Sequence, residues 1–225
     1  MSARYDAEKG DTVPSDYHHH AAVVTAAPYS PPKRANPTPL GLFSFASTTL
    51  LLSFLNANVR GLHAANMVVG MAFFVGGIAQ FVAGIFEYYA GATFGFTAFV
   101  TYGCFWGSIG CIFWPSSGIL AAYKTPEDLN SALGLFMMVW FVFTTIMTIG
   151  TIRSNVGLFC VFFSVDITFL LLGIGHLTIN PHILQAGGYV GIIAAFFAYY
   201  VATSALYAAE GMPFSLPVVP LVKDD

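Results

Sequence analysis

The chain has 225 residues, of which 56% are hydrophobic and only 8% are charged, with a formal net charge of −3. Soluble domains carry roughly 25% charged residues, so these few charges cannot cover a water-soluble surface of this size. The small net charge and the lack of a basic cluster argue against a nucleic-acid-binding protein. The composition therefore predicts an integral membrane protein of the all-α class.

The first part of the chain, 1–35, is polar and contains prolines but no apolar core, so we expect a disordered cytoplasmic tail there. No apolar region follows the start, so no signal peptide is expected. The histidine run at 18–20 is too short to indicate a metal site, and neither a metal nor a cofactor is expected in the chain. A short C-terminal tail is expected at 211–225.

Between these tails lies a predicted six-span transport domain, 36–210. Its apolar stretches approach the roughly 20 residues that a helix needs to cross a bilayer. We expect the spans at 39–58, 65–90, 94–114, 131–152, 156–176 and 184–209. Thr125, followed by Pro126 and Asp128, is typical of a helix start, so the fourth helix should begin near Pro126. The short turn at Arg153 predicts that the fourth and fifth helices are antiparallel neighbours.

Basic residues predict the orientation of the spans. With six spans both termini share a side, and that side holds six Lys and Arg residues against two on the other. The bias is four against two without Arg4 and Lys9, which lie far along the tail. The excess predicts a multi-pass protein of the plasma membrane with both termini in the cytoplasm. The six are Arg4, Lys9, Lys33, Arg34, Arg153 and Lys223, and the two are Arg60 and Lys124.

Small residues form stripes on two of the predicted spans. The second span repeats glycine every seven residues, and Gln80 and Glu87 each follow one of these glycines by three positions. Small residues let helices approach closely in lipid, so the stripes predict helix contacts within or between subunits and favour an oligomer. The stripes are Gly70, Gly77, Gly84 and Gly91, then Gly187, Gly191, Ala195, Ala198, Ala202, Ala205 and Ala209.

Weakly polar side chains also recur on single helix faces, and two interpretations of them stay open. Each hydroxyl can bond its own helix backbone, as buried Ser and Thr often do. Alternatively, the stripes form the weakly polar lining of a narrow path. They comprise Ser44, Ser47, Thr48 and Ser53, then Thr97, Thr101, Cys104, Ser108 and Cys111, and finally Thr144, Thr148 and Thr151.

Charged side chains are scarce inside the spans. Asp166 lies at the middle of the fifth span, where an aspartate costs roughly 2.5 to 3.5 kcal/mol, so it should face protein or water. It is a candidate proton site or a structural acceptor for a hydroxyl or a tryptophan N–H. Glu87 and His176 lie near span ends and are expected at the membrane interface. No catalytic grouping is visible, so an enzyme is not expected.

The entry to the first span combines prolines with polar residues in the stretch "NPTPLGL". Pro39 suits a helix start, while Asn36 and Thr38, each before a proline, should stay extended and cap the helix. The free N–H groups and the positive helix end then form a natural carboxylate site. A plain cap at the membrane surface is the alternative.

This stretch, Asn36 to Leu42, resembles the signature Asn-Pro-Ala-Pro-Leu-Gly-Leu of the acetate uptake transporters, also called succinate–acetate permeases. The segments 76–106 and Val161–Val165 are also similar to that family, and the resemblance extends over most of 36–210. It implies six spans per subunit, a homohexameric ring and a path through each subunit.

The resemblance also implies transport of acetate and related small monocarboxylates, with succinate as a further substrate, either coupled to protons or channel-like. It implies a narrowing formed by Phe45, Tyr102 and Val165. Substrate-binding positions are expected at Asn36, Thr38, Leu40 and Thr49, with Gln80 and Glu87 as further polar positions. Val165 replaces a leucine of the family, which should widen the narrowing, and Thr38 replaces an alanine.

The partners expected from this resemblance are small carboxylates, protons, membrane lipid and further copies of the chain. Two other functions stay open at this point. One is a membrane sensor or scaffold that transports nothing, in which the hydroxyl stripes only pack. The other is export of ammonia.

Overall fold

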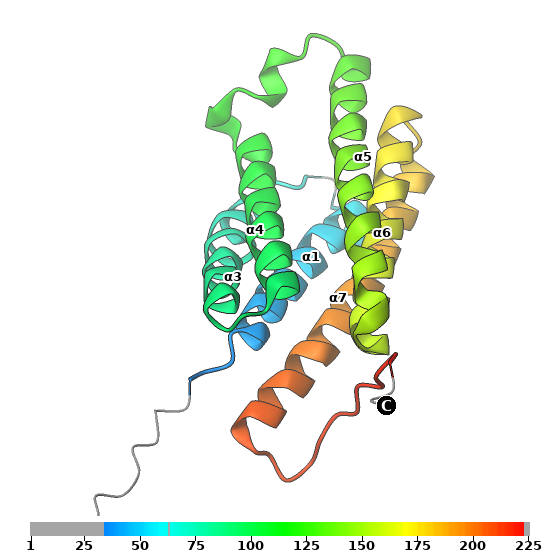
Figure 1. Cartoon of the computed structure of the whole chain (residues 1–225). Coiled ribbons are helices and arrows are strands. Elements are labelled where there is room, and N and C mark those ends of the chain that lie inside the picture. Colours follow the sequence, from blue (N-terminus) through cyan, green and yellow to red (C-terminus); the bar gives the residue numbers. More distant parts are fainter. Residues whose placement is uncertain (1–33, 63, 223–225) are drawn as a thin grey trace, which may run out of the picture. The chain divides into compact units, whose positions relative to one another are not determined.

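The computed structural model describes residues 34–62 and 64–222 (Figure 1). Within these residues the regular elements are all helical, and six helices are long and apolar enough to cross a membrane. The prediction of an all-α protein with six spans is therefore confirmed. The elements are α1 (Thr38–Asn56), η1 (Val59–Gly61), α2 (Val68–Met71), η2 (Ala72–Ala79), α3 (Gln80–Tyr89), α4 (Thr93–Phe113), η3 (Pro115–Ser117), η4 (Leu120–Ala122), α5 (Pro126–Gly150), η5 (Thr151–Arg153), α6 (Val156–Leu177) and α7 (Pro181–Glu210).

The predicted start of the fourth span at Pro126 is confirmed, and side-chain caps explain it. Thr125 Oγ1 accepts a hydrogen bond from the Asp128 N–H at 3.1 Å. Asn155 caps α6 in the same way, through the Leu158 N–H at 2.8 Å. The short turn between α5 and α6 leaves these helices side by side, as predicted (Figure 1).

The start of α1 differs from the prediction. The helix begins at Thr38, one residue early, because a proline in the first helical turn costs no hydrogen bond there. The N-cap position is Pro37, without a side-chain cap, and Asn36 Oδ1 one residue earlier accepts a hydrogen bond from the Thr38 N–H at 3.1 Å. The Thr38 side chain does not cap its own helix and instead donates to Glu87 Oε1 at 2.6 Å.

Helix α1 joins two groups of helices. It packs against α7 on one side and against the continuous span Val68–Tyr89 on the other. The first group continues from α7 to α6 and α5, and the second pairs α3 with α4 (Figure 1). Aromatic side chains of α4 and α6 meet between the two groups, among them Phe94 and Phe162, whose ring centroids are 5.2 Å apart.

The stripe of small residues on α7 packs inside the subunit. Ala195, Ala198 and Ala202 are fully buried, and a Cβ at Gly191 would collide with Ser53 of α1. On the second span only part of the glycine stripe behaves this way. A Cβ at Gly84 would lie 2.8 Å from the Val100 nitrogen of α4. Gly70 faces open space, whereas Gly91 ends the helix with a left-handed φ of 74°.

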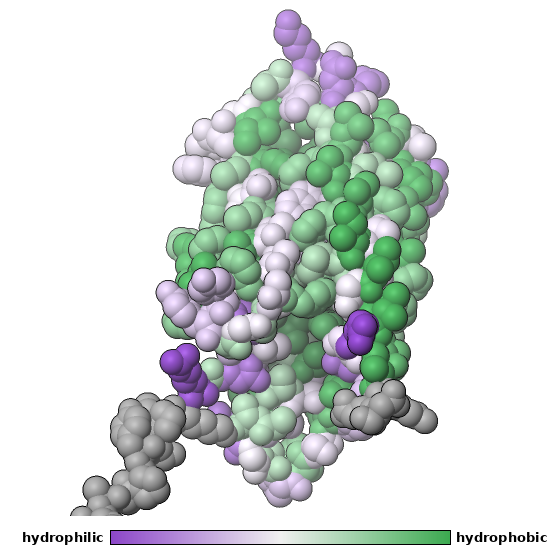
Figure 2. Space-filling view, viewed as in Figure 1, coloured by the Kyte–Doolittle hydropathy of each residue, from purple (hydrophilic) through white to green (hydrophobic). Residues whose placement is uncertain are grey.

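The face of the molecule in Figure 2 carries a broad apolar band with polar residues at its two ends. Helix α5 contributes large exposed side chains at helical spacing, namely Leu135, Val139, Val142, Ile146 and Ile149. Such a face suits contact with lipid tails or with another apolar helix.

The weakly polar stripe on α4 faces outward. Cys104, Ser108 and Cys111 are exposed, and the Thr97 and Ser108 hydroxyls each donate to the carbonyl four residues earlier, both at 2.9 Å. Within the subunit, the interpretation of this stripe as a path lining is therefore wrong. Its side chains lie on the outer surface, and two of its hydroxyl groups bond the backbone of their own helix. On α5 and α1, Thr148 and Thr48 likewise bond their own helix backbone.

Candidate functional site

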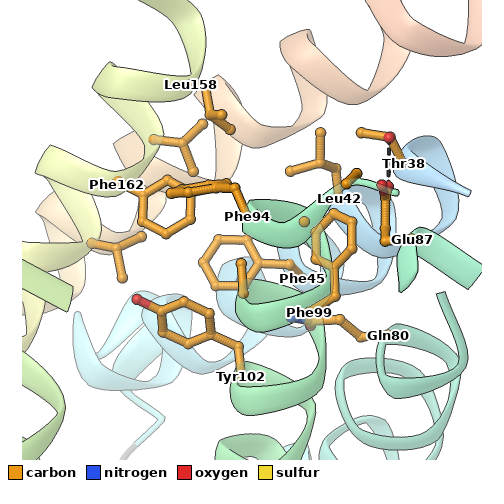
Figure 3. Close-up of a pocket in the computed structure, with 15 residues that line it drawn as sticks. Thr38, Leu42, Phe45, Gln80, Glu87, Phe94, Phe99, Tyr102, Leu158 and Phe162 are labelled. Atoms are coloured by element: carbon orange, nitrogen blue, oxygen red, sulfur yellow. Dashed lines mark hydrogen bonds between the residues drawn. The ribbon is translucent and has the colours of Figure 1, made fainter. Parts of the chain in front are cut away.

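A cavity of about 220 Å³ lies between α1, α3, α4 and α6, and we call it the first cavity (Figure 3). Its wall is largely apolar and aromatic, and it contains no lysine or arginine. The lining residues are Thr38, Leu42, Phe45, Gln80, Glu87, Ala92, Phe94, Gly95, Ala98, Phe99, Tyr102, Leu158, Val161, Phe162 and Val165.

A second, smaller cavity of about 40 Å³ continues along α1. Phe45 and Val165 line both cavities and therefore separate them. The other residues around the second cavity are Thr49, Leu52, Ser53, Asn56, Phe105, Trp106, Met137, Thr168, Phe169 and Leu172. Because Thr38, Phe45, Thr49 and Asn56 recur on one face of α1, the two cavities lie in series along that helix.

The structure brings together the three residues predicted to form the narrowing. Phe45, Tyr102 and Val165 are all buried at the wall of the first cavity. The Phe45 and Tyr102 rings meet edge to face with centroids 6.0 Å apart. The Tyr102 hydroxyl forms a hydrogen bond of 2.8 Å with Thr144 Oγ1 of α5, and this bond holds the ring in place. Their role in selecting a solute stays a prediction.

At the other end of the first cavity, Thr38 of α1 meets Glu87 of α3 (Figure 3). Glu87 is only 4% exposed, although it lies two residues before the end of α3. Its location at the membrane interface stays a prediction. Gly95 of α4 makes room for it, since a Cβ there would lie 2.9 Å from Glu87 Oε2. The sequence placed Glu87 near a helix end but could not show that α1 and α4 cover it.

Three buried polar groups around the cavities have no hydrogen-bond partner within the described part of the chain. They are both amide atoms of Gln80 in the first cavity, and Thr49 Oγ1 and Trp106 Nε1 in the second. Buried polar groups are nearly always paired, so unpaired ones on a cavity wall are candidate ligand contacts. The sequence singled out Gln80 and Thr49 but not Trp106, because a tryptophan in an apolar span resembles a packing residue.

The remaining predicted site residues lie away from both cavities. Asn36 is exposed, and Leu40 is 47% exposed at the start of α1. Asp166 is buried at 8% exposure and accepts hydrogen bonds from Thr145 Oγ1 at 2.9 and 3.2 Å, as the structural alternative expected. Its neighbour Val165 faces the cavities, but Asp166 faces α5.

No group of three or more His, Cys, Asp or Glu side chains over 34–62 and 64–222 is arranged to hold a metal ion. The histidine run at 18–20 lies outside these residues. The contacts available to a solute are therefore uncharged dipoles and aromatic rings, together with the Glu87 carboxyl group.

Comparison with known proteins agrees with the resemblance of the first-span signature. Ammonia transport outward protein 2 of Saccharomyces cerevisiae is 43% identical, over 85% of this chain and 70% of its own length. Acetate permease A of Emericella nidulans is 40% identical, over 83% and 66% of the two chains. The succinate-acetate/proton symporter SatP of Escherichia coli is 39% identical, over 76% and 87%.

A solved structure of the bacterial acetate channel SatP superposes with a TM-score of 0.73 at 37% identity, covering 83% of this chain and 99% of that one. The model of the GPR1/FUN34/yaaH family matches residues 19–223. Sequence and fold thus agree over most of the chain, and the chain belongs to the GPR1/FUN34/yaaH family.

Proposed function

We propose that this protein transports acetate and related small monocarboxylates across a membrane, through the two cavities inside each subunit. The observation that carries the proposal is the series of two cavities along α1, separated by Phe45 and Val165. The relatives named acetate permease and acetate channel support acetate as the solute.

The size and lining of the first cavity fit a small organic acid. A cavity of roughly 10–15 Å³ admits one water molecule, so about 220 Å³ holds acetate with several waters. The narrowing formed by Tyr102, Phe45 and Val165 then selects by the cross-section of the solute and by the free energy of removing its hydration water. Both are smallest for a short monocarboxylate. Succinate is a poorer substrate on this account, since it carries a second carboxyl group.

An anion crosses this narrowing only after it is neutralised. A bare carboxylate in an apolar wall without lysine or arginine is costly, because a buried charge needs a partner. A proton joins acetate before it reaches the narrowing, so the two move together as acetic acid, and the proton is released again on the other side. The name of the Escherichia coli relative, a succinate-acetate/proton symporter, supports this coupling.

Two buried carboxyl groups are candidates for handling that proton. Asp166 was the candidate from the sequence, yet its side chain faces Thr145. Glu87 lines the first cavity beside Thr38, at the end that faces the cytoplasm in the proposed orientation. We therefore assign the exchange of protons with the cavity to Glu87, and a structural role to Asp166.

The wider arrangement is also part of this proposal. Subunits form a homohexameric ring in the plasma membrane with both termini in the cytoplasm, and each subunit has its own path. The outward apolar face of α5 and the small residues on the outer face of α4 support contacts with lipid and with other copies. The protein is not an enzyme on this account.

Export of ammonia is the second candidate, and one observation favours it. The relative named ammonia transport outward protein 2 is 43% identical. Ammonia is small and uncharged and fits both cavities, so the geometry admits it. The cavities do not require it, because an opening for ammonia alone needs far less space than about 220 Å³.

The test is uptake of labelled acetate into liposomes that contain only this protein. Uptake is expected above that of empty vesicles, and faster when the outside is more acidic than the inside. A second set of vesicles, loaded with ammonia, measures its efflux. No acetate uptake above empty vesicles contradicts the proposal, and ammonia efflux without acetate uptake replaces it with the second candidate.

A further inference from the structure

The amide of Gln80 is an uncharged polar group set into the wall of the first cavity. Its side chain is 1% exposed, and neither Oε1 nor Nε2 has a hydrogen-bond partner in the described part of the chain. In Figure 3 it lies beside Phe99 at the cavity edge. An amide held away from water with both ends unpaired loses hydrogen bonds that only a cavity occupant restores.

The helix around Gln80 is built in an unusual way. Gln80 begins α3 directly after η2, which is a π-helix from Ala72 to Ala79. π-helical turns occur frequently at functional sites, where they change which side chains face a given side. Gly76 permits this wide turn to pack on α4, because a Cβ there would lie 2.6 Å from the Trp106 ring. The local fold therefore holds Gln80 in its position.

The chemistry of an amide decides what it can bind. Oε1 accepts hydrogen bonds and Nε2 donates them, with no net charge. An ionised carboxylate only accepts, so it uses half of this pair, whereas an un-ionised carboxyl group donates through its O–H and accepts through its C=O. The wall offers no lysine or arginine to compensate an anion, and the Glu87 carboxyl group stands at its rim.

We propose that Gln80 binds the un-ionised acid as a paired donor and acceptor, and that the same cavity accepts small uncharged primary amides. Acetamide has the shape of acetic acid with an NH₂ group in place of the hydroxyl, so it offers Gln80 the same donor and acceptor. The inference rests on the proposed acetate function, and it adds a class of substrate and a residue that selects for it.

The experiment uses liposomes with the full chain and follows labelled acetate and labelled acetamide, each compared with empty vesicles. Acetamide is expected to enter faster than into empty vesicles, and to compete with acetate at a pH where nearly all acetate is ionised. Gln80→Leu should raise the half-saturating concentration of acetate about tenfold and slow protein-dependent acetamide uptake by a similar factor. Gln185→Leu, the same exchange on α7 at a residue that lines neither cavity, should change neither.

Several results overturn the inference. Acetate uptake without protein-dependent acetamide uptake or competition shows that the site requires a carboxyl group, and leaves the proposed function standing. Unchanged acetate and acetamide kinetics in Gln80→Leu remove Gln80 from the site. Acetamide uptake without acetate uptake sustains the selection of uncharged molecules and removes the proposed function. If Gln80→Leu does not assemble, the inference is tested by the unmodified protein alone, through its uptake of acetamide and the competition of acetamide with acetate.

Discussion

Two carboxyl groups, Asp166 and Glu87, are buried inside the subunit and face different helices. A charge at mid-span marks Asp166 as constrained, but the direction of its side chain follows from how α6 packs on α5, where Thr145 donates to it. Glu87 lies close to the end of its helix, which suggests an exposed position. In the structure, however, Thr38 and Gly95 from two other helices cover it. Position along a helix is visible in a sequence, whereas the partner of a helix face is not.

Glu87→Gln is expected to alter the pH dependence of acetate uptake, because it removes a proton-exchanging group from the cavity and keeps the side chain's shape. The groups that face Glu87 in the described residues, Thr38 of α1 and Gly95 of α4, do not titrate. Asp166→Asn, the matched exchange at the other carboxyl, should keep the parent's profile and lower stability by about 1 kcal/mol. Uptake rates over a pH series check this, and a profile altered only in Asp166→Asn would reverse the assignment.

Tyr102→Ala should admit larger acids relative to acetate, since it removes the ring that meets Phe45 between the cavities. Relative uptake of acetate, lactate and succinate measures the change. Tyr102→Phe is the control: it keeps the ring, loses the bond to Thr144, and should cost about 1 kcal/mol of stability with selection unchanged. Equal substrate ratios in the parent and in Tyr102→Ala would exclude a role in selection.

At the scale of the helix, local signals in the sequence predicted the elements well. The length of the apolar stretches predicted the six spans, and the pair Thr125 and Pro126 predicted the start of α5. The π-helix η2 was missed, because widening a helical turn changes no residue type. The outward direction of the α4 stripe was also missed: periodicity defines a face of a helix but not the neighbour it meets.

The glycines of the second span make a testable pair. Gly84→Leu should disrupt folding or assembly, costing at least about 1–3 kcal/mol, because its Cβ would lie 2.8 Å from the Val100 nitrogen of α4. Gly70→Leu places the same side chain where a Cβ meets nothing within 4 Å in the subunit. Thermal unfolding and size-exclusion profiles in detergent compare the two. A well-assembled Gly84→Leu protein with the parent's melting temperature would refute the packing role.

At the scale of the whole molecule, the proposed transport needs only the compact unit from Ala35 to Asp225. Both cavities are lined only by residues from Thr38 to Leu172. A chain that begins near Pro31 should therefore take up acetate at the parent's rate in liposomes. A shortened protein that assembles normally but carries no acetate would show that the polar tail takes part in transport.

In the proposed function, acetate passes through the first cavity of each subunit. Ala98 of α4 is buried in the wall of that cavity, whereas Cys104, Cys111 and Cys160 line neither the first nor the second. Acetate uptake by Ala98→Cys is therefore measured before and after reaction with N-ethylmaleimide, and the parent chain treated in the same way is the control. We expect the modified Ala98→Cys protein to lose uptake while the parent keeps it. Full uptake after complete modification of Cys at position 98 would contradict a path through this cavity.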